Sequence, residues 1–141
     1  MTVHEKSAWI MTFALLVGGI FYGLTVAAMS SGLGMIAPPV LPTVLIYTII
    51  LIIIAIVGHI LAATSSPADA NEVVDERQRR IADKASHLSA YVLGIGVLSA
   101  LGLYLLTYNG NLMFYVLFAS WMLSQLLEYV MQIVLHRQGV Y

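Results

Sequence analysis

The stretch NLMFYVLFASWMLSQLLEYVMQIVLH, residues Asn111–His136, decides the fold of this chain. Its length and apolar character are those of a helix that crosses a lipid bilayer, and it contains a single formal charge, Glu128. Counting back from His136 at about 1.5 Å per helical residue places Glu128 roughly 12 Å deep. A carboxyl at that depth costs about 2.5 kcal/mol or more on insertion scales, so we expect it to face a bundle interior and to have a partner.

The rest of the chain has the composition of an integral membrane protein. Of its 141 residues, 60% are hydrophobic and 9% are charged, whereas globular domains are about 45–50% apolar. We expect four spans, at about 7–29, 42–63, 86–107 and 111–136. The sequence therefore predicts a single all-α domain, a polytopic four-helix bundle, with a linker and a helical stalk at 64–85.

The basic residues predict how the spans are oriented. Threading the four spans places every basic residue on the side that holds both chain ends: Lys6, Arg77, Arg79, Arg80, Lys84 and Arg137. By the positive-inside rule that side is the cytoplasm. The opposite side, residues 30–41 and 108–110, contains no charged residue and no histidine. We expect a bacterial or archaeal cytoplasmic membrane protein with both termini in the cytoplasm.

Several classes of function lack their sequence signals here. The chain has no cysteine, which excludes disulfides, iron–sulfur clusters and thiolate metal sites. The net charge of −1 and the absence of a long basic run argue against direct nucleic-acid binding. No HExxH, GxSxG or phosphate-loop motif is present, so we expect neither an enzyme nor a bound cofactor.

An internal repeat suggests a duplication. The segment EKSAWIMTFALLVG (Glu5–Gly18) matches DKASHLSAYVLGIG (Asp83–Gly96) at an offset of 78, and His59 matches His136 at an offset of 77. The pattern predicts two parallel helical hairpins related by a pseudo-two-fold axis along the membrane normal.

Small residues recur at a spacing of four in two of the spans. Gly19 and Gly23 form such a pair in the first span, and Gly96 and Ala100 form one in the third. Pairs of this kind let helix backbones approach closely in lipid. We therefore expect the first and third spans to make the central contact of the bundle.

Polar residues recur every four positions along the fourth span, in a line that we call the polar line: Ser120, Ser124, Glu128, Gln132 and His136. A step of four turns the helix by about 400°, so the line follows one broad face, with Gln125 beside it. This face must point inward, because lipid would leave a carboxylate and two amides without hydrogen bonds. On the third span, Tyr91 lies near the depth of Glu128 and is the expected donor to it, with Ser89 and Ser99 as lesser possibilities.

Glu128 admits three roles. It is either hydrogen-bonded glue between helices, a proton-titrating or ligand-binding carboxylate in a polar cavity, or a lipid-facing contact in a homo-oligomer. An aromatic stripe on the same span, with Phe114, Tyr115, Phe118 and Trp121, faces either lipid or a larger membrane complex.

The four histidines all fall toward the cytoplasmic ends of the expected helices: His4, His59, His87 and His136. Imidazole binds both metals and haem, and a shared depth on several helices is what such a site requires. Interfacial or capping histidines would show the same pattern. If a site exists, His59, His87 and His136 are its candidate ligands, and His59 and His136 are the best axial pair.

The segment before the third span predicts a charged helical stalk. Asp75 with Arg79, and Glu76 with Arg80, are spaced i,i+4 with the acid first, the favourable order for helix pairs. The helix would then project about 15 Å into the cytoplasm. It is either a solvated helix end or a docking surface for a soluble protein, carried by Asp75, Glu76, Arg77, Arg79 and Arg80.

The segment from Val74 to Gly96 carries a further pattern: D-E-R at Asp75–Arg77, then Ile81, Lys84, Ala85, and Tyr91 ahead of an apolar run. In this it resembles a family of small four-helix membrane proteins of bacteria and archaea whose function is unknown. Some small proteins of this kind are thought to work with a soluble helix-turn-helix regulator, so the resemblance implies a cytoplasmic partner. It implies no catalytic residue.

Three functional hypotheses remain open. The first is a small inner-membrane sensor, accessory or regulatory subunit that binds a protein partner through its membrane face or its stalk. The second is a small oligomeric transporter or channel that uses Glu128 for proton or cation coupling. The third is haem or metal binding through the histidines. In each case the lipid bilayer is one partner, and another protein or a second copy of the chain is expected.

Overall fold

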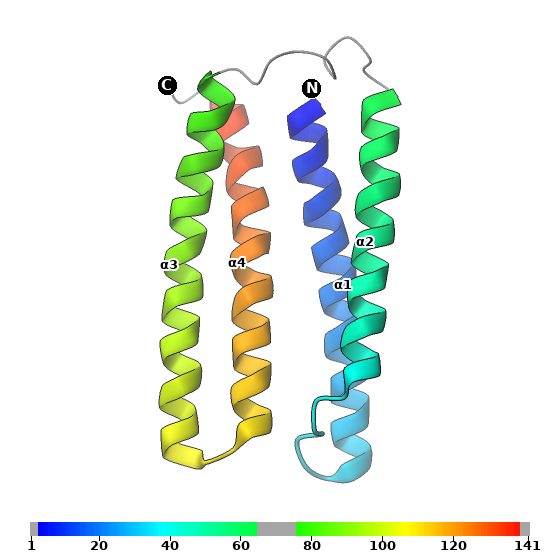
Figure 1. Ribbon diagram of the computed structural model, residues 1–141, viewed down its shortest axis with the longest axis vertical. Helices are drawn as coiled ribbons and strands as arrows, with labels where there is room; N and C mark the ends of the chain where they lie inside the picture. The colour runs from blue at the N-terminus through cyan, green and yellow to red at the C-terminus, as the bar shows by residue number, and fades with distance from the viewer. Residues whose placement is uncertain (1–2, 65–75, 139–141) are drawn as a thin grey trace.

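The protein is an all-α membrane protein of four helices, seen in a computed structural model that describes residues 3–64 and 76–138 (Figure 1). The helices are α1 (Val3–Leu33), α2 (Leu41–Thr64), α3 (Glu76–Thr107) and α4 (Gly110–Gln138). Each is long and apolar enough to cross a membrane, which confirms the four predicted spans.

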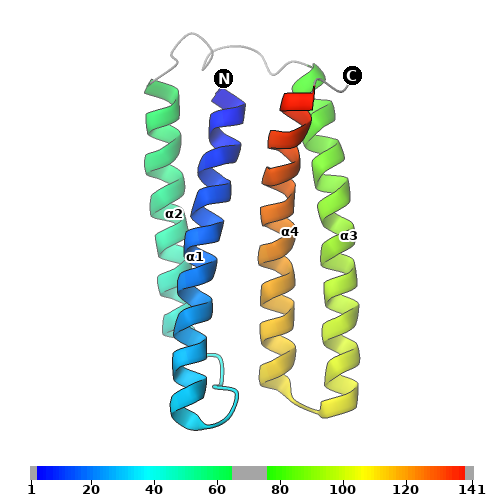
Figure 2. The same cartoon turned by 180° about the vertical axis from the view of Figure 1, so that it is seen from behind.

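The helices of the bundle form a row by contact, in which each helix makes its main contacts with its neighbours in the row. Figures 1 and 2 show the order α3, α4, α1, α2 from both sides. The main contacts join α1 to α2, α3 to α4, and α1 to α4. Two antiparallel hairpins are thus joined through their inner helices, α1 and α4.

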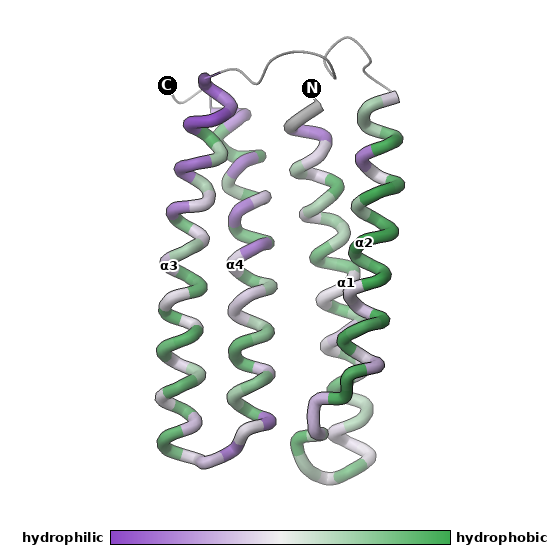
Figure 3. The backbone as a smooth tube through the Cα atoms, viewed as in Figure 1, coloured by the Kyte–Doolittle hydropathy of each residue, from purple (hydrophilic) through white to green (hydrophobic). Residues whose placement is uncertain are grey.

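The two ends of the molecule differ in polarity. Hydrophilic residues gather at the end where α1 and α3 begin and α2 and α4 finish (Figure 3). We call this the charged end. The other end, with the turns at 34–40 and 108–109, has no charged side chain and is called the uncharged end.

Within each hairpin, a glycine permits close approach of the two helices. A Cβ atom on Gly18 would lie 3.0 Å from Cε2 of Tyr47 on α2. A Cβ atom on Gly96 would overlap the side chain of Ser120 on α4. These glycines are equivalent in the sequence repeat, and each faces the second helix of its own hairpin. The duplication itself stays a prediction.

The central contact is not the predicted one. We expected α1 and α3 to meet through their small residues, but α1 meets α4, and Gly19 faces Met122 there. The small residues of α3 are used within its own hairpin, where Ala100 is fully buried and Gly96 contacts Ser120. The pair on which the expectation rested, Gly96 and Ala100, is therefore not available to α1.

The turn between α3 and α4 is short and well capped. Tyr108 adopts a left-handed conformation, with φ 52°, and its N–H donates to the carbonyl of Tyr104 at 2.7 Å. The side chain of Asn109 then accepts from the N–H of Leu112 at 3.0 Å, which satisfies one of the free donors at the start of a helix.

The connection at 34–40 is bound to α4. The hydroxyl of Tyr115 donates to the carbonyl of Ala37 at 3.0 Å, and the amide of Asn111 donates to the carbonyl of Ile36 at 3.4 Å. The N–H of Ala37 donates to the hydroxyl of Ser30 at 3.1 Å. These bonds satisfy backbone groups that would be costly to leave unpaired in or near lipid.

Part of the aromatic stripe on α4 lies inside rather than toward lipid. The ring of Phe118 is 4.7 Å from that of Tyr22 on α1 and 5.4 Å from that of Tyr47 on α2. Only Trp121 is largely exposed, at 44%. The stripe was expected to face lipid or a larger membrane complex, but α4 lies beside α1, and Tyr22 of α1 and Tyr47 of α2 pack against Phe118.

Candidate functional site

The predicted partner of Glu128 is provided by α3. The hydroxyl of Ser89 lies 3.4 Å from Oε2 of Glu128. The hydroxyl of Ser124 donates to the backbone carbonyl of Ser89 at 2.8 Å. We call this group, with Ser86, the serine–glutamate seam; it confirms that the polar line faces the protein interior at Ser124 and Glu128.

Small side chains on both helices make this seam possible. On α3, Ala85 and Ser89 are buried at 0% and 3% exposure, and on α4 Ser124 is buried at 2%. Because these side chains are short, a hydroxyl on one helix reaches the backbone of the other, which is how polar groups join helices in membranes. Glu128 itself is half-buried.

The hydrogen bonds of the seam depend on whether the Glu128 carboxyl carries a proton. The Ser89 hydroxyl has one proton and two acceptors, the Ser86 carbonyl at 2.9 Å and the Glu128 carboxyl at 3.4 Å. When that proton is on the shorter bond, the Glu128 contact is a hydrogen bond only if the carboxyl donates its own proton to Ser89. The seam can therefore hold Glu128 in either state, with a different donor in each.

Glu128 has no ion-pair partner among residues 3–64 and 76–138. The ion pairs there are at the charged end, between Glu76 and Arg80 and between Glu5 and Arg137. Among the described residues, a charged Glu128 would have only the Ser89 hydroxyl as a hydrogen-bond donor, which compensates a carboxylate in a membrane weakly.

The remaining residues of the polar line have different surroundings. Ser120 donates to the carbonyl of Val116 in its own helix at 2.6 Å while it packs against Gly96. Gln125 and Gln132 are half-buried. The backbone carbonyl of His136 accepts from Arg77 at 3.5 Å, so the line ends in a contact between α4 and α3.

The structure does not bring Tyr91 to Glu128. Tyr91 is 66% exposed, and its ring lies against that of His87, 6.2 Å away. It follows Ser89 by two residues, which is about 200° around a helix. With Ser89 in the seam, Tyr91 must point to the opposite side, so the lesser candidate is the partner and the preferred one was wrong.

The histidines are not gathered into one site. No group of three or more His, Asp or Glu side chains that could hold a metal occurs in the described part of the chain. His59 uses both ring nitrogens: Nδ1 donates to the carbonyl of Ala55 at 2.6 Å, and Nε2 bonds the hydroxyl of Ser7 at 2.7 Å. His87 is exposed. The side chain of His4 lies outside the described residues.

The stalk begins with α3 at Glu76, and Asp75 lies outside the described residues. Glu76 and Arg80 form the predicted pair at 3.8 Å, with side chains 89% and 78% exposed. Such exposed pairs add little stability. Arg77 and Arg79 are also exposed, so the charged residues assigned to the stalk lie on its surface.

One contact at the charged end was not predicted. Arg137 on α4 lies 3.7 Å from the carboxyl of Glu5 on α1 and 5.5 Å from the ring centre of Trp9. It joins α1 to α4, and so the two hairpins, at the charged end. The sequence does place an acid and a base at the same depth on two helices, which could have indicated an ion pair. They are neighbours only because α1 packs against α4.

Two buried tyrosines were also missed. Tyr47 is 1% exposed and its hydroxyl has no hydrogen-bond partner in the described structure, while Tyr22 beside it is 5% exposed. Buried tyrosine hydroxyls usually find a partner. Each is a tyrosine within an apolar span, and this feature of the sequence could have identified it as a buried polar group.

Comparisons of this chain with protein-family models, with curated proteins and with solved structures give no match.

Proposed function

We propose that this chain is an accessory or regulatory subunit of a bacterial or archaeal cytoplasmic membrane. Its stalk binds a soluble protein in the cytoplasm. The observation that carries the proposal is the continuity of α3, which runs as one helix from the apolar span into a segment of exposed charged residues: Glu76, Arg77, Arg79, Arg80, Asp83 and Lys84.

The stalk is held firmly enough to act as a recognition surface. One face is fixed to the rest of the protein, since Ile81 and Ala85 are buried at 4% and 0% exposure and Arg77 donates to the His136 carbonyl. The remaining faces carry charges of both signs. A fixed helix with a defined charge pattern recognises a partner by complementary charge, which sets specificity more than affinity.

A charge-swapped variant tests this proposal. Exchanging the pair, as Glu76→Arg with Arg80→Glu, keeps the net charge and the helical pair but reverses the pattern seen by a partner. We expect a protein that the tagged wild type recovers from native membranes, and that recovers this chain in return, to be lost from the variant. A partner that binds both forms equally, or the lack of any reciprocal partner, contradicts the proposal.

A second function is favoured by the serine–glutamate seam. Glu128 lies within a span and has Ser89, which suits either protonation state, as its hydrogen-bond partner. In this alternative an oligomer carries protons or cations, with Glu128 as the titrating group. Reconstitution into liposomes tests it: a pH-dependent flux must appear in the wild type and disappear in Glu128→Gln. A wild type without flux removes this alternative.

A further inference from the structure

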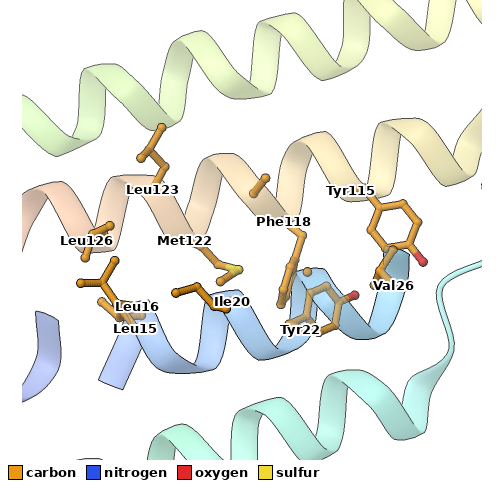
Figure 4. Close-up of a pocket in the computed structure, with 13 residues that line it drawn as sticks. Leu15, Leu16, Ile20, Tyr22, Val26, Tyr115, Phe118, Met122, Leu123 and Leu126 are labelled. Atoms are coloured by element: carbon orange, nitrogen blue, oxygen red, sulfur yellow. The ribbon is translucent and has the colours of Figure 1, made fainter. Parts of the chain in front are cut away.

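A groove lies along the joint between the two hairpins. It has a volume of about 470 Å³ and runs between α1 and α4 (Figure 4). This is within the range of about 300–1,000 Å³ typical of small-molecule sites. The exposed side chains of Leu16, Ile20 and Leu123 form its edges, so it is reached from the surrounding lipid.

The groove has the shape of a channel for a single chain. Its lining on α1 extends from Leu15 to Val26, which is about 16 Å of helix. Its lining includes three small residues, Gly19, Gly23 and Ala119, and the methyl group of Met122 lies over Gly19. A Cβ atom on Gly23 would meet nothing within 4 Å, so the space above this glycine is not filled by the protein.

One end of the groove carries hydroxyl groups. Figure 4 shows the hydroxyls of Tyr22 and Tyr115 together at the end nearer the 34–40 connection. Tyr115 donates to the carbonyl of Ala37. Tyr22 is 5% exposed, and its hydroxyl has no hydrogen bond to any residue that the structure describes. A hydroxyl that lines a groove without a partner is a donor available to a ligand.

The surroundings of these hydroxyls select a neutral head group. The uncharged end, residues 30–41 and 108–110, contains no Lys, Arg, His, Asp or Glu, and hydrophilic residues gather at the opposite end (Figure 3). A charged head group would find no counter-charge there. An oxygen acceptor such as an ester or ketone carbonyl needs only the proton of Tyr22.

We infer that this groove binds one neutral amphiphile, whose long apolar chain lies between α1 and α4 and whose carbonyl oxygen accepts a hydrogen bond from Tyr22. Both a membrane ester lipid and a membrane quinone offer this chemistry. The site is separate from the stalk and from the serine–glutamate seam, so it stands or falls independently of the proposed function.

Two matched glycine variants test the site. Gly23→Leu adds a branched side chain to the groove lining, at a position where a Cβ atom would meet nothing within 4 Å. Gly94→Leu adds the same side chain to an exposed and equally open position of α3. Each protein is purified from native membranes with extensive detergent washing, and its bound compounds are identified and counted by mass spectrometry.

We expect wild type and Gly94→Leu to retain one class of long-chain neutral compound, and Gly23→Leu to lose it. The mass of that compound distinguishes an ester lipid from a quinone. Equal amounts in the two variants would mean that only surrounding lipid is present, and would overturn the inference, as would a wild type that retains nothing.

The role of Tyr22 is tested with two defined probes, monooleoylglycerol and a benzoquinone with a ten-carbon chain. At least one must bind the delipidated wild type and fail to bind Gly23→Leu. Tyr22→Phe, which removes only the hydroxyl, should lower the affinity for that probe by about 3–10-fold. Binding of neither probe, or unchanged affinity in Tyr22→Phe, contradicts the assigned geometry.

Discussion

The hydroxyl of Ser89 lies 3.4 Å from Oε2 of Glu128, and this contact joins α3 to α4 inside the membrane. It gives the one charge within a span a partner that can donate to a carboxylate or accept from a carboxylic acid. A substitution at Glu128 therefore tests this contact.

Glu128→Gln should keep most of the stability of the protein. The amide can donate to Ser89 in place of a carboxylic acid, and interhelical hydrogen bonds in membranes are worth only about 0.6 kcal/mol on average. We expect the melting temperature in detergent to change by no more than about 2–4 °C. Glu128→Lys, which puts an ammonium at the same depth, should lower it more. A large loss in the glutamine variant would show that the carboxyl has a partner beyond the seam.

Gly96→Ala should separate α3 from α4. The added Cβ overlaps Ser120, and overpacking of this kind costs about 1–3 kcal/mol. The control is Gly94→Ala, where the new methyl group meets nothing within 4 Å and the helix gains propensity. Thermal unfolding of the detergent-solubilised protein measures both. Adding Ser120→Gly to the first variant should restore part of its stability, and no rescue would argue that the two residues are not in contact.

Tyr108→Gly should stabilise the turn between α3 and α4. Tyr108 has a φ of 52°, a conformation that costs an ordinary residue about 1–2 kcal/mol. Glycine removes that cost but loses about 0.5–1 kcal/mol of entropy, so the net gain is at most about 1.5 kcal/mol. Leu106→Gly, at an exposed helical position, should instead destabilise. If Tyr108→Gly leaves the melting temperature of the protein unchanged, the left-handed conformation of Tyr108 does not strain the turn.

The contact of Arg137 with Glu5 should couple the two hairpins only weakly. The Glu5 side chain is 15% exposed, but that of Arg137 is 64% exposed, and an ion pair that solvent reaches from one side contributes about 1 kcal/mol or less. A double-mutant cycle of Glu5→Gln and Arg137→Gln measures the coupling, which should shrink as salt is added. A coupling above 2 kcal/mol that is insensitive to salt would place this pair in a much drier setting than its exposure indicates.

We predict that His59 ligates neither haem nor a metal ion. Both ring nitrogens of His59 are engaged by Ser7 and Ala55, and the described residues offer no set of three ligands. The purified protein should show no Soret band, and chelation should leave its melting temperature unchanged. Stoichiometric metal in elemental analysis, lost in His59→Ala, would reverse this conclusion.

The four helices could be predicted from the sequence because span length and apolar composition are local properties. The early start of α3 was predicted from the charge pairs ahead of the span, and the structure begins the helix at Glu76. A partner for Glu128 was also predicted, since a carboxyl inside a membrane requires one.

The predictions that were wrong depended on how each helix is rotated about its axis and on which helices pack together. Local sequence patterns determine neither. Tyr91 and Ser89 have nearly the same depth, and only the rotation of α3 decides which one meets Glu128. The small residues were expected to join α1 to α3, but Gly19 faces Met122 of α4, Gly96 faces Ser120 of α4, and Gly23 faces no protein atom within 4 Å. The Arg137–Glu5 contact has the same origin: it exists because α1 and α4 are the inner helices.

The row arrangement has a consequence for how the sequence tolerates change. α2 and α3 each have one main neighbour, and the outward residues of α2, such as Ile46, Ile53 and Ile60, are more than half exposed. Such positions need only be apolar, so many side chains satisfy them equally well. α1 and α4 each pack against two helices, and there shape as well as polarity limits the choice. Sequence drift should therefore accumulate on the flanks of the row, while the inner pair keeps its residues.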